Sequence, residues 1–162
     1  MRAYVGLGAN LGDARAAVRA GLAALGALPQ TRLAAASSLY TSAPVDADGP
    51  DFVNAAAALD TALDARALLA ALLAIEARHG RARPYRNAPR TLDLDLLLFG
   101  DTVSDDPLLT LPHPRMAGRA FVLVPLAEIA PGLALPGGAR VATLAAALAG
   151  QTVIRLPEES AP

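Results

Sequence analysis

The segment from Thr91 to Phe99 constrains the fold more than any other part of the chain. It reads Thr-Leu-Asp-Leu-Asp-Leu-Leu-Leu-Phe, an alternation of leucine and aspartate that ends in a leucine run. Side chains point alternately to the two faces of a strand. The pattern therefore predicts a strand whose core face carries Leu92, Leu94, Leu96 and Leu98. Asp93 and Asp95 would share the opposite face, about 7 Å apart along the strand.

Two carboxylates this close to each other must be compensated. They repel, and both are costly to remove from water in such an apolar strand. Mg²⁺ would offset the charge, because it typically takes one or two carboxylates together with substrate phosphates. The alternative is a strand with one solvated face, and the Asp-x-Asp pair alone does not decide between the two. The apolar centre of the strand favours the cation, because aspartate is uncommon in strands.

Arginine is concentrated directly before this strand. All 14 cationic residues are arginine, and the stretch 78–90 holds five of them, Arg78, Arg81, Arg83, Arg86 and Arg90. Arginine binds phosphate through a planar fork of donors. Cations beside an aspartate–magnesium centre suit phosphoryl transfer, in which charge builds on phosphate oxygens. The alternative is a solvated basic turn after a helix C-terminus, which explains Arg78 well and Arg90 poorly.

Length, composition and charge exclude several other classes of protein. A chain of 162 residues suits one domain, predicted over 1–162. It contains no cysteine, which excludes a disulfide scaffold and a thiol nucleophile. The absence of lysine excludes a P-loop enzyme, and the net charge of -1 argues against a general nucleic-acid binder. No apolar run reaches the length of a membrane span and no signal peptide is present, so a cytoplasmic protein is predicted.

The other periodic segments predict an α+β fold. Strands are predicted over 3–7, 33–40, 52–61 and 91–99, and helices over 14–26, 64–79, 119–129 and 139–149. Gly6, Gly8 and Gly12 are assigned to a tight turn rather than to a nucleotide fingerprint. The order of these elements is typical of a ferredoxin-like fold, an antiparallel sheet with helices packed on both faces.

Six segments occur with the order and spacing of a known family. They are 5–12, 37–40, 51–56, 89–95, 111–114 and 119–121, and the most specific is Pro-Arg-Thr-Leu-Asp-Leu-Asp at 89–95. On these segments the chain closely resembles the 6-hydroxymethyl-7,8-dihydropterin pyrophosphokinases of folate biosynthesis. The resemblance covers residues 3–136 and implies transfer of pyrophosphate from ATP to the pterin's hydroxymethyl group. The products would be AMP and (7,8-dihydropterin-6-yl)methyl diphosphate.

The resemblance also implies roles for individual residues. It makes Asp93 and Asp95 ligands of two Mg²⁺ ions that bridge the ATP phosphates. The implied catalytic residues are Arg81, Arg90, Asp93 and Asp95. The implied ATP site comprises Glu76, Arg83, Arg90, Leu96, Thr110, His113 and Arg119. The implied pterin site comprises Ser42, Ala43, Pro44, Val45, Phe52, Asn54 and Phe121, with two phenyl rings stacking on the flat heterocycle.

Two other functions remain open at this point. One is a non-catalytic ferredoxin-like module that binds a nucleotide or pterin without turnover. The other is a metal-dependent nuclease, which also uses paired acids and Mg²⁺. The paired aspartates argue against the first, and the net charge of -1 argues against the second. The expected partners are ATP and the hydroxymethyldihydropterin, bound by a monomer that engages neither nucleic acid nor membrane.

Overall fold

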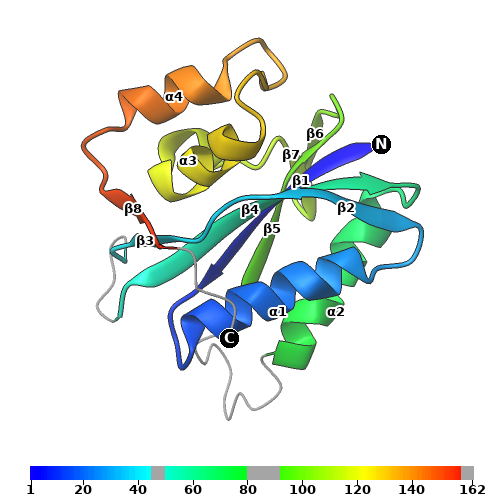
Figure 1. Ribbon diagram of the computed structural model, residues 1–162. Coiled ribbons are helices and arrows are strands. Elements are labelled where there is room, and N and C mark those ends of the chain that lie inside the picture. The colour runs from blue at the N-terminus through cyan, green and yellow to red at the C-terminus, as the bar shows by residue number, and fades with distance from the viewer. Residues whose placement is uncertain (45–49, 80–91, 158–162) are drawn as a thin grey trace.

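The computed structural model describes residues 1–44, 50–79 and 92–157 and is built around one antiparallel sheet (Figure 1). Its strands are β1 (Arg2–Ala9), β2 (Thr31–Ala36), β3 (Tyr40–Ser42), β4 (Phe52–Thr61), β5 (Asp93–Phe99) and β8 (Val153–Arg155). β1 lies between β5 and β4, while β2 and β3 pair in succession with the other edge of β4. β6 (Ser104–Asp106) and β7 (Leu109–Leu111) form a separate hairpin.

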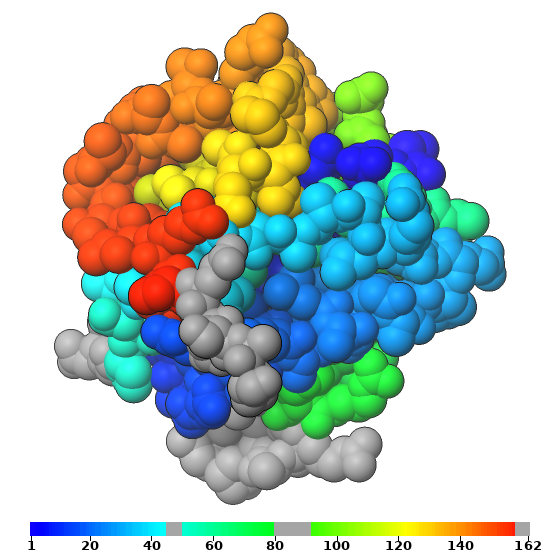
Figure 2. Space-filling model, viewed as in Figure 1, coloured from blue at the N-terminus to red at the C-terminus, as the bar shows by residue number. Residues whose placement is uncertain are grey.

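Helices cover both faces of the sheet, which confirms the predicted fold class (Figure 1). α1 (Ala14–Gly26) and α2 (Ala65–His79) pack on one face. α3 (Ala120–Ile129) packs on the other, and α4 (Val141–Ala147) and the segment leading to β8 lie beside it (Figure 2). Across the described residues, none of the helices has both the length and the apolar character that crossing a membrane requires.

The first two helices begin where an aspartate caps them. The Asp13 side chain accepts a hydrogen bond from the Ala16 amide at 3.0 Å. Asp64 does the same for the Ala67 amide at 2.8 Å. Each cap satisfies one of the amides that a helix leaves without a partner in its first turn. Both helices start within one residue of the predicted positions.

Two apolar clusters hold the layers together. Leu25, Leu72 and Val5 belong to the cluster between the sheet and α1 and α2, and none of their side-chain surface is exposed. Leu97 and Leu123 belong to the cluster between the sheet and α3. Each fully buried leucine contributes about 1.5–3 kcal/mol relative to an exposed one. The sheet therefore packs apolar side chains against the helices on both of its faces.

A β-bulge changes the face on which one predicted core leucine lies. β5 pairs Leu96 with Val5 and Leu98 with Tyr4, and the register shifts between these pairs. Leu97 is the extra residue, so the alternation of faces reverses after it. Leu96 packs toward α1 and α2, whereas Leu97 and Leu98 both pack toward α3. The prediction that Leu98 shares a face with Leu92, Leu94 and Leu96 is therefore wrong.

The predicted strand over 33–40 is two shorter strands, β2 and β3. Ser37 still bonds to β4, because its amide donates to the Ala56 carbonyl at 2.8 Å. The Ser38 amide instead donates to the Glu128 carboxylate on α3 at 3.0 Å. Pairing with β4 stops there and resumes at Tyr40. A side chain from another layer thus breaks a strand that local periodicity predicts as continuous.

Candidate active site

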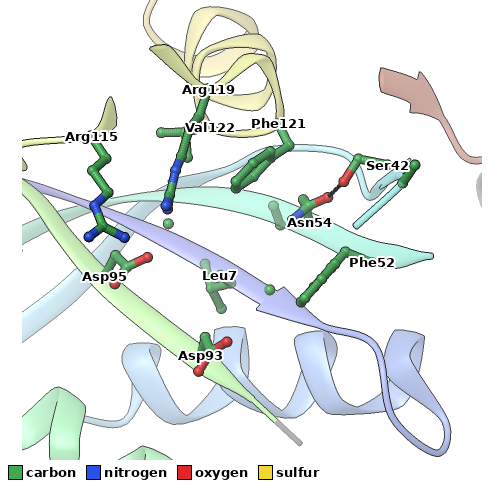
Figure 3. Close-up of a pocket in the computed structure, with 14 residues that line it drawn as sticks. Leu7, Ser42, Phe52, Asn54, Asp93, Asp95, Arg115, Arg119, Phe121 and Val122 are labelled. Atoms are coloured by element: carbon green, nitrogen blue, oxygen red, sulfur yellow. Dashed lines mark hydrogen bonds between the residues drawn. The ribbon is translucent and has the colours of Figure 1, made fainter. Parts of the chain in front are cut away.

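A cavity of about 380 Å³ opens on the α3 side of the sheet, where β1, β4 and β5 meet at one end (Figure 3). Residues from five separate parts of the chain line it. Those predicted as site residues are Ser42, Ala43, Phe52, Asn54, Asp93, Asp95, Arg119 and Phe121. The fold therefore brings the predicted pterin side chains and both aspartates to one cavity.

Gly6 and Gly8 form part of the cavity wall. Both lie inside β1, where Gly6 pairs with Asp95 and Gly8 pairs with Asp93. A Cβ on Gly8 would lie 3.4 Å from the Asn54 side-chain nitrogen and 3.8 Å from the Phe52 ring. The turn predicted for these two glycines is wrong, although Gly12, with φ of 60°, does occupy a turn. Glycine inside a strand often marks a close approach by a ligand, and this signal was present in the sequence.

The two aspartates lie on the same face of β5, as predicted, and both reach the cavity (Figure 3). β5 is an edge strand of the sheet. Its Leu94 amide donates to the Glu76 carboxylate of α2 at 2.8 Å. Glu76 therefore holds the strand segment between Asp93 and Asp95, which positions both carboxylates.

The opposite end of the cavity combines aromatic rings with a buried amide. Asn54 is 3% exposed and lies between Phe52 and Phe121 in the close-up view (Figure 3). The Ser42 hydroxyl donates to Asn54 Oδ1 at 2.6 Å, which orients the amide. The Arg119 guanidinium lies 5.5 Å from the centre of the Phe121 ring, in cation–π contact. This end suits a flat heterocycle with hydrogen-bonding groups along its edge.

His113 lies beside Asp95. Its Nδ1 accepts a hydrogen bond from the Arg115 amide at 3.2 Å, so a neutral ring carries its proton on Nε2. Nε2 is 3.8 Å from an Asp95 carboxylate oxygen. Burial lowers the pKa of His113, and the positive charges of Arg119 and Arg115 lower it further against the opposing effect of Asp95. The ring is thus held as a neutral donor that faces the carboxylate.

A second cavity of about 310 Å³ adjoins the first at Asp95, which lines both. Four of the predicted ATP-site residues line it: Glu76, Leu96, Thr110 and His113. The side chain of Leu73, also in its wall, is 53% exposed. The structure therefore separates the predicted residues into two neighbouring groups that share one aspartate.

Some predicted site residues are not in either group. Arg81, Arg83, Arg90 and Val45 lie outside the described residues. Pro44 is described but is not among the residues that line the larger cavity.

Comparison with known proteins identifies the family. The family model of 7,8-dihydro-6-hydroxymethylpterin-pyrophosphokinase (HPPK) matches residues 4–131. The chain belongs to this family. A 2-amino-4-hydroxy-6-hydroxymethyldihydropteridine pyrophosphokinase of Pseudomonas aeruginosa is 52% identical over 157 residues, which cover 96% of this chain and 97% of the relative. Its counterpart from Haemophilus influenzae is 42% identical over 155 residues, covering 95% and 97%.

Solved structures share the HPPK fold. A Plasmodium falciparum HPPK-DHPS with SDX-DHP superposes with a TM-score of 0.74 at 12% identity, over 92% of this chain. An HPPK-DHPS in complex with substrates gives a TM-score of 0.71, also at 12% identity and over 92% of this chain. The chain spans 44% and 43% of the length of these solved chains. At such low identity the likeness shows the fold alone.

Arg115 is a cavity residue that the sequence reasoning missed. It lines the larger cavity of this HPPK chain together with Arg119. Pro114 and Arg115 follow His113 in a turn, and nothing in their local pattern distinguishes the arginine from an ordinary surface residue. Its place beside the aspartates depends on how this turn packs against β5.

The donor set of the HPPK site fits a cation that is bound jointly with phosphate. Within the described ranges there is no group of three or more His, Cys, Asp or Glu side chains able to hold a metal ion. Asp93 and Asp95 offer two carboxylates at an open cavity. Mg²⁺ commonly binds through one or two carboxylates and completes its shell with water and substrate phosphates. The residues present are therefore compatible with Mg²⁺ carried in with a nucleotide.

A hydrogen-bonded cluster fixes the wall of the larger cavity to α3. The Glu128 carboxylate accepts hydrogen bonds from the Tyr40 hydroxyl and from the Ser38 hydroxyl and amide. Burial alone would raise the pKa of Glu128, but the hydrogen bonds from Tyr40 and Ser38 lower it. Tyr40 lies two residues before Ser42 on β3. The cluster thus ties the strand that carries Ser42 to the helix that carries Phe121.

Tyr40 is expected to titrate well above the ordinary pKa of a tyrosine. Burial, together with its hydrogen bond to Glu128, raises the pKa of Tyr40 to about 12, compared with about 10 in an unfolded chain. Between these values the folded state keeps a proton that the unfolded state loses. The contribution to stability is therefore complete below about pH 10 and is lost as pH rises toward about 12.

Ultraviolet titration of phenolate formation in wild type and Tyr40→Phe checks this expectation. The component that titrates with a pKa of about 12 should be missing from the variant. A variant that keeps this component would contradict the role of the cluster.

Proposed function

We propose that this chain transfers pyrophosphate from ATP to the hydroxymethyl group of 6-hydroxymethyl-7,8-dihydropterin, a step of folate biosynthesis. The pterin occupies the larger cavity and the nucleotide occupies the smaller one. The observation that carries this assignment is that Asp95 lines both cavities. The Asp95 carboxylate therefore lies where the hydroxymethyl group of the pterin would meet the phosphates of ATP. Family membership supports the same reaction.

The pterin is held by stacking and by its polar edge. Phe52 and Phe121 take the two faces of the ring, and the Asn54 amide meets the edge. We also assign the backbone of 42–45 to binding of the pterin, and of these residues Ser42 and Ala43 line the cavity. Stacking fixes the plane of the ring, and the amide fixes its rotation in that plane. The hydroxymethyl group then points along the cavity toward the aspartates.

Two Mg²⁺ ions, held by Asp93 and Asp95 with the ATP phosphates, would supply charge neutralisation at the triphosphate. The bond that forms joins the hydroxymethyl oxygen to the β-phosphorus, and the hydroxyl proton is released to water. The bond that breaks joins the β-phosphorus to the oxygen bridging it to the α-phosphorus, so AMP leaves. Arg119, which lines the same cavity as both aspartates, is placed to bind phosphate oxygens. The loose transition state of phosphoryl transfer places little demand on a general base.

Residues near the nucleotide position it for the transfer. Thr110 and Leu96 contribute to the wall of the smaller cavity, and His113 offers its Nε2 proton to a phosphate oxygen beside Asp95. We assign Arg81 and Arg90 to the catalytic loop and Arg83 to ATP binding. Residues 1–162 act together as one pyrophosphokinase domain.

Measurement of AMP release tests this function. AMP should form only when ATP, hydroxymethyldihydropterin and Mg²⁺ are all present. The amount of AMP should equal the amount of the pterin diphosphate. Binding of ligands without AMP formation would instead identify a non-catalytic binding module. Hydrolysis of a nucleic acid would identify a nuclease. AMP formation that does not require the pterin would also overturn the proposal.

A further inference from the structure

Arg115 supplies a positive charge to the larger cavity that the proposed function does not use. It lines this cavity with Asp93, Asp95 and Arg119, and its guanidinium is directed toward Asp95 (Figure 3). Within residues 1–44, 50–79 and 92–157, no ion pair engages the Arg115 guanidinium. An arginine that neighbours carboxylates without forming an ion pair keeps its donors available for an anion.

The backbone that carries Arg115 is firmly placed. The Arg115 amide donates to the His113 ring at 3.2 Å, and the His113 amide donates to the Leu97 carbonyl of β5 at 2.9 Å. The next residue, Met116, is 1% exposed and belongs to the apolar cluster under α3. The turn is thus attached to the strand that presents the aspartates. The backbone therefore needs no rearrangement for the Arg115 side chain to reach an anion in the cavity.

The position of Arg115 distinguishes it from the four predicted nucleotide residues of the smaller cavity, whereas Arg119 shares the larger cavity with it. Arg115 lines the larger cavity together with Phe52 and Asn54, whereas His113 lines the smaller cavity. In the proposed function the larger cavity first receives a pterin without phosphate. After the transfer, the same cavity holds a pterin whose hydroxymethyl oxygen carries a diphosphate. A charge on this side is therefore close to the diphosphate once it belongs to the product.

We infer that Arg115 binds the diphosphate group of the pterin product, and that it distinguishes the product from the unphosphorylated pterin. This inference rests on the proposed function. The planar guanidinium can form two parallel hydrogen bonds to phosphate oxygens. The unphosphorylated pterin offers it no anionic partner. Arg115 therefore stabilises the product complex selectively.

Calorimetric titrations of 6-hydroxymethylpterin and of its diphosphate ester, both with Mg²⁺, test the inference. Arg115→Ala should weaken binding of the diphosphate ester by about 10- to 100-fold, the loss typical of one hydrogen-bonded charged group. Its affinity for the unphosphorylated pterin should stay at the wild-type value. Arg140→Ala is the matched control, because Arg140 is exposed, precedes α4 and lines neither cavity. It makes the same change in net charge and should alter neither affinity.

The outcomes separate this inference from the function on which it rests. An Arg115→Ala variant that binds the diphosphate ester as well as wild type does would overturn the role of Arg115 alone. Equal weakening of both ligands would also overturn it, because it would show a general effect on the pocket. A wild-type protein that binds neither pterin would overturn the proposed function as well.

Discussion

Replacement of Asp95 by asparagine is expected to lower kcat by about 10³-fold or more, because metal-assisted stabilisation of transferred phosphate supplies several kcal/mol. Asp95 lines both cavities, and its side chain is 47% exposed, so it can reach a cation without disturbing the core. Asparagine keeps the shape of the side chain and removes its charge. Steady-state AMP release at saturating ATP and pterin, over a range of Mg²⁺ concentrations, measures the effect.

Asp101→Asn provides the matched control. Asp101 lies in the exposed turn directly after β5, so the substitution makes the same chemical change close to the same strand. Its kcat should equal that of wild type. Pterin binding without ATP and Mg²⁺ should survive in Asp95→Asn, which would show that the cavity is intact. A kcat for Asp95→Asn within tenfold of wild type would contradict the metal role.

Replacement of Asn54 by alanine is expected to raise the Kd for the pterin by about 10²-fold, because a site built to hydrogen-bond its ligand is left with unpaired groups. Asn54 is 3% exposed at the end of the cavity opposite the aspartates. Its loss also removes the acceptor of the Ser42 hydroxyl. Affinity for ATP should not change, since Asn54 does not line the smaller cavity. Fluorescence titrations of pterin and of a nonhydrolysable ATP analogue measure both constants.

Ser42→Ala separates the ligand contact from the support for it. This variant removes the hydroxyl that orients Asn54 but leaves the amide in place. We expect a smaller loss of pterin affinity, together with an unchanged affinity for ATP. If Ser42→Ala and Asn54→Ala weaken pterin binding equally, the Asn54 amide does not contact the ligand. Thermal unfolding of both variants checks that the buried polar change has not unfolded the protein.

Local periodicity predicted much of the fold. The helices α1 and α2 lie close to the ranges 14–26 and 64–79 that apolar spacing predicted, and Asp13 and Asp64 cap them. β4 runs over the predicted 52–61. These features depend on neighbouring residues along the chain, so the sequence expresses them directly. The β-bulge after Leu96 could not be predicted in this way, because it arises from the pairing of β5 with β1.

The candidate site was predictable in its parts but not in its arrangement. Motif resemblance named both aspartates and the aromatic residues, and the strand period placed Asp93 and Asp95 on one face. Neither the resemblance nor the strand period indicated two cavities that meet at Asp95. The local glycine pattern predicted a turn at Gly6 and Gly8, although the pairing of β1 with β5 places them opposite the two aspartates. Cavities and cross-strand neighbours depend on contacts between distant segments, which no local pattern records.

The sequence by itself determined the chemistry of this protein. It placed two carboxylates on one strand, concentrated arginines before that strand and distributed the motifs of a pyrophosphokinase along the chain. The tertiary structure alone decided which groups meet. It set Phe52 and Phe121 on two sides of one cavity and brought Arg115 beside the aspartates. The physical reason is that residue identity and period are local properties, whereas the neighbours of a charge are set by packing across the whole fold.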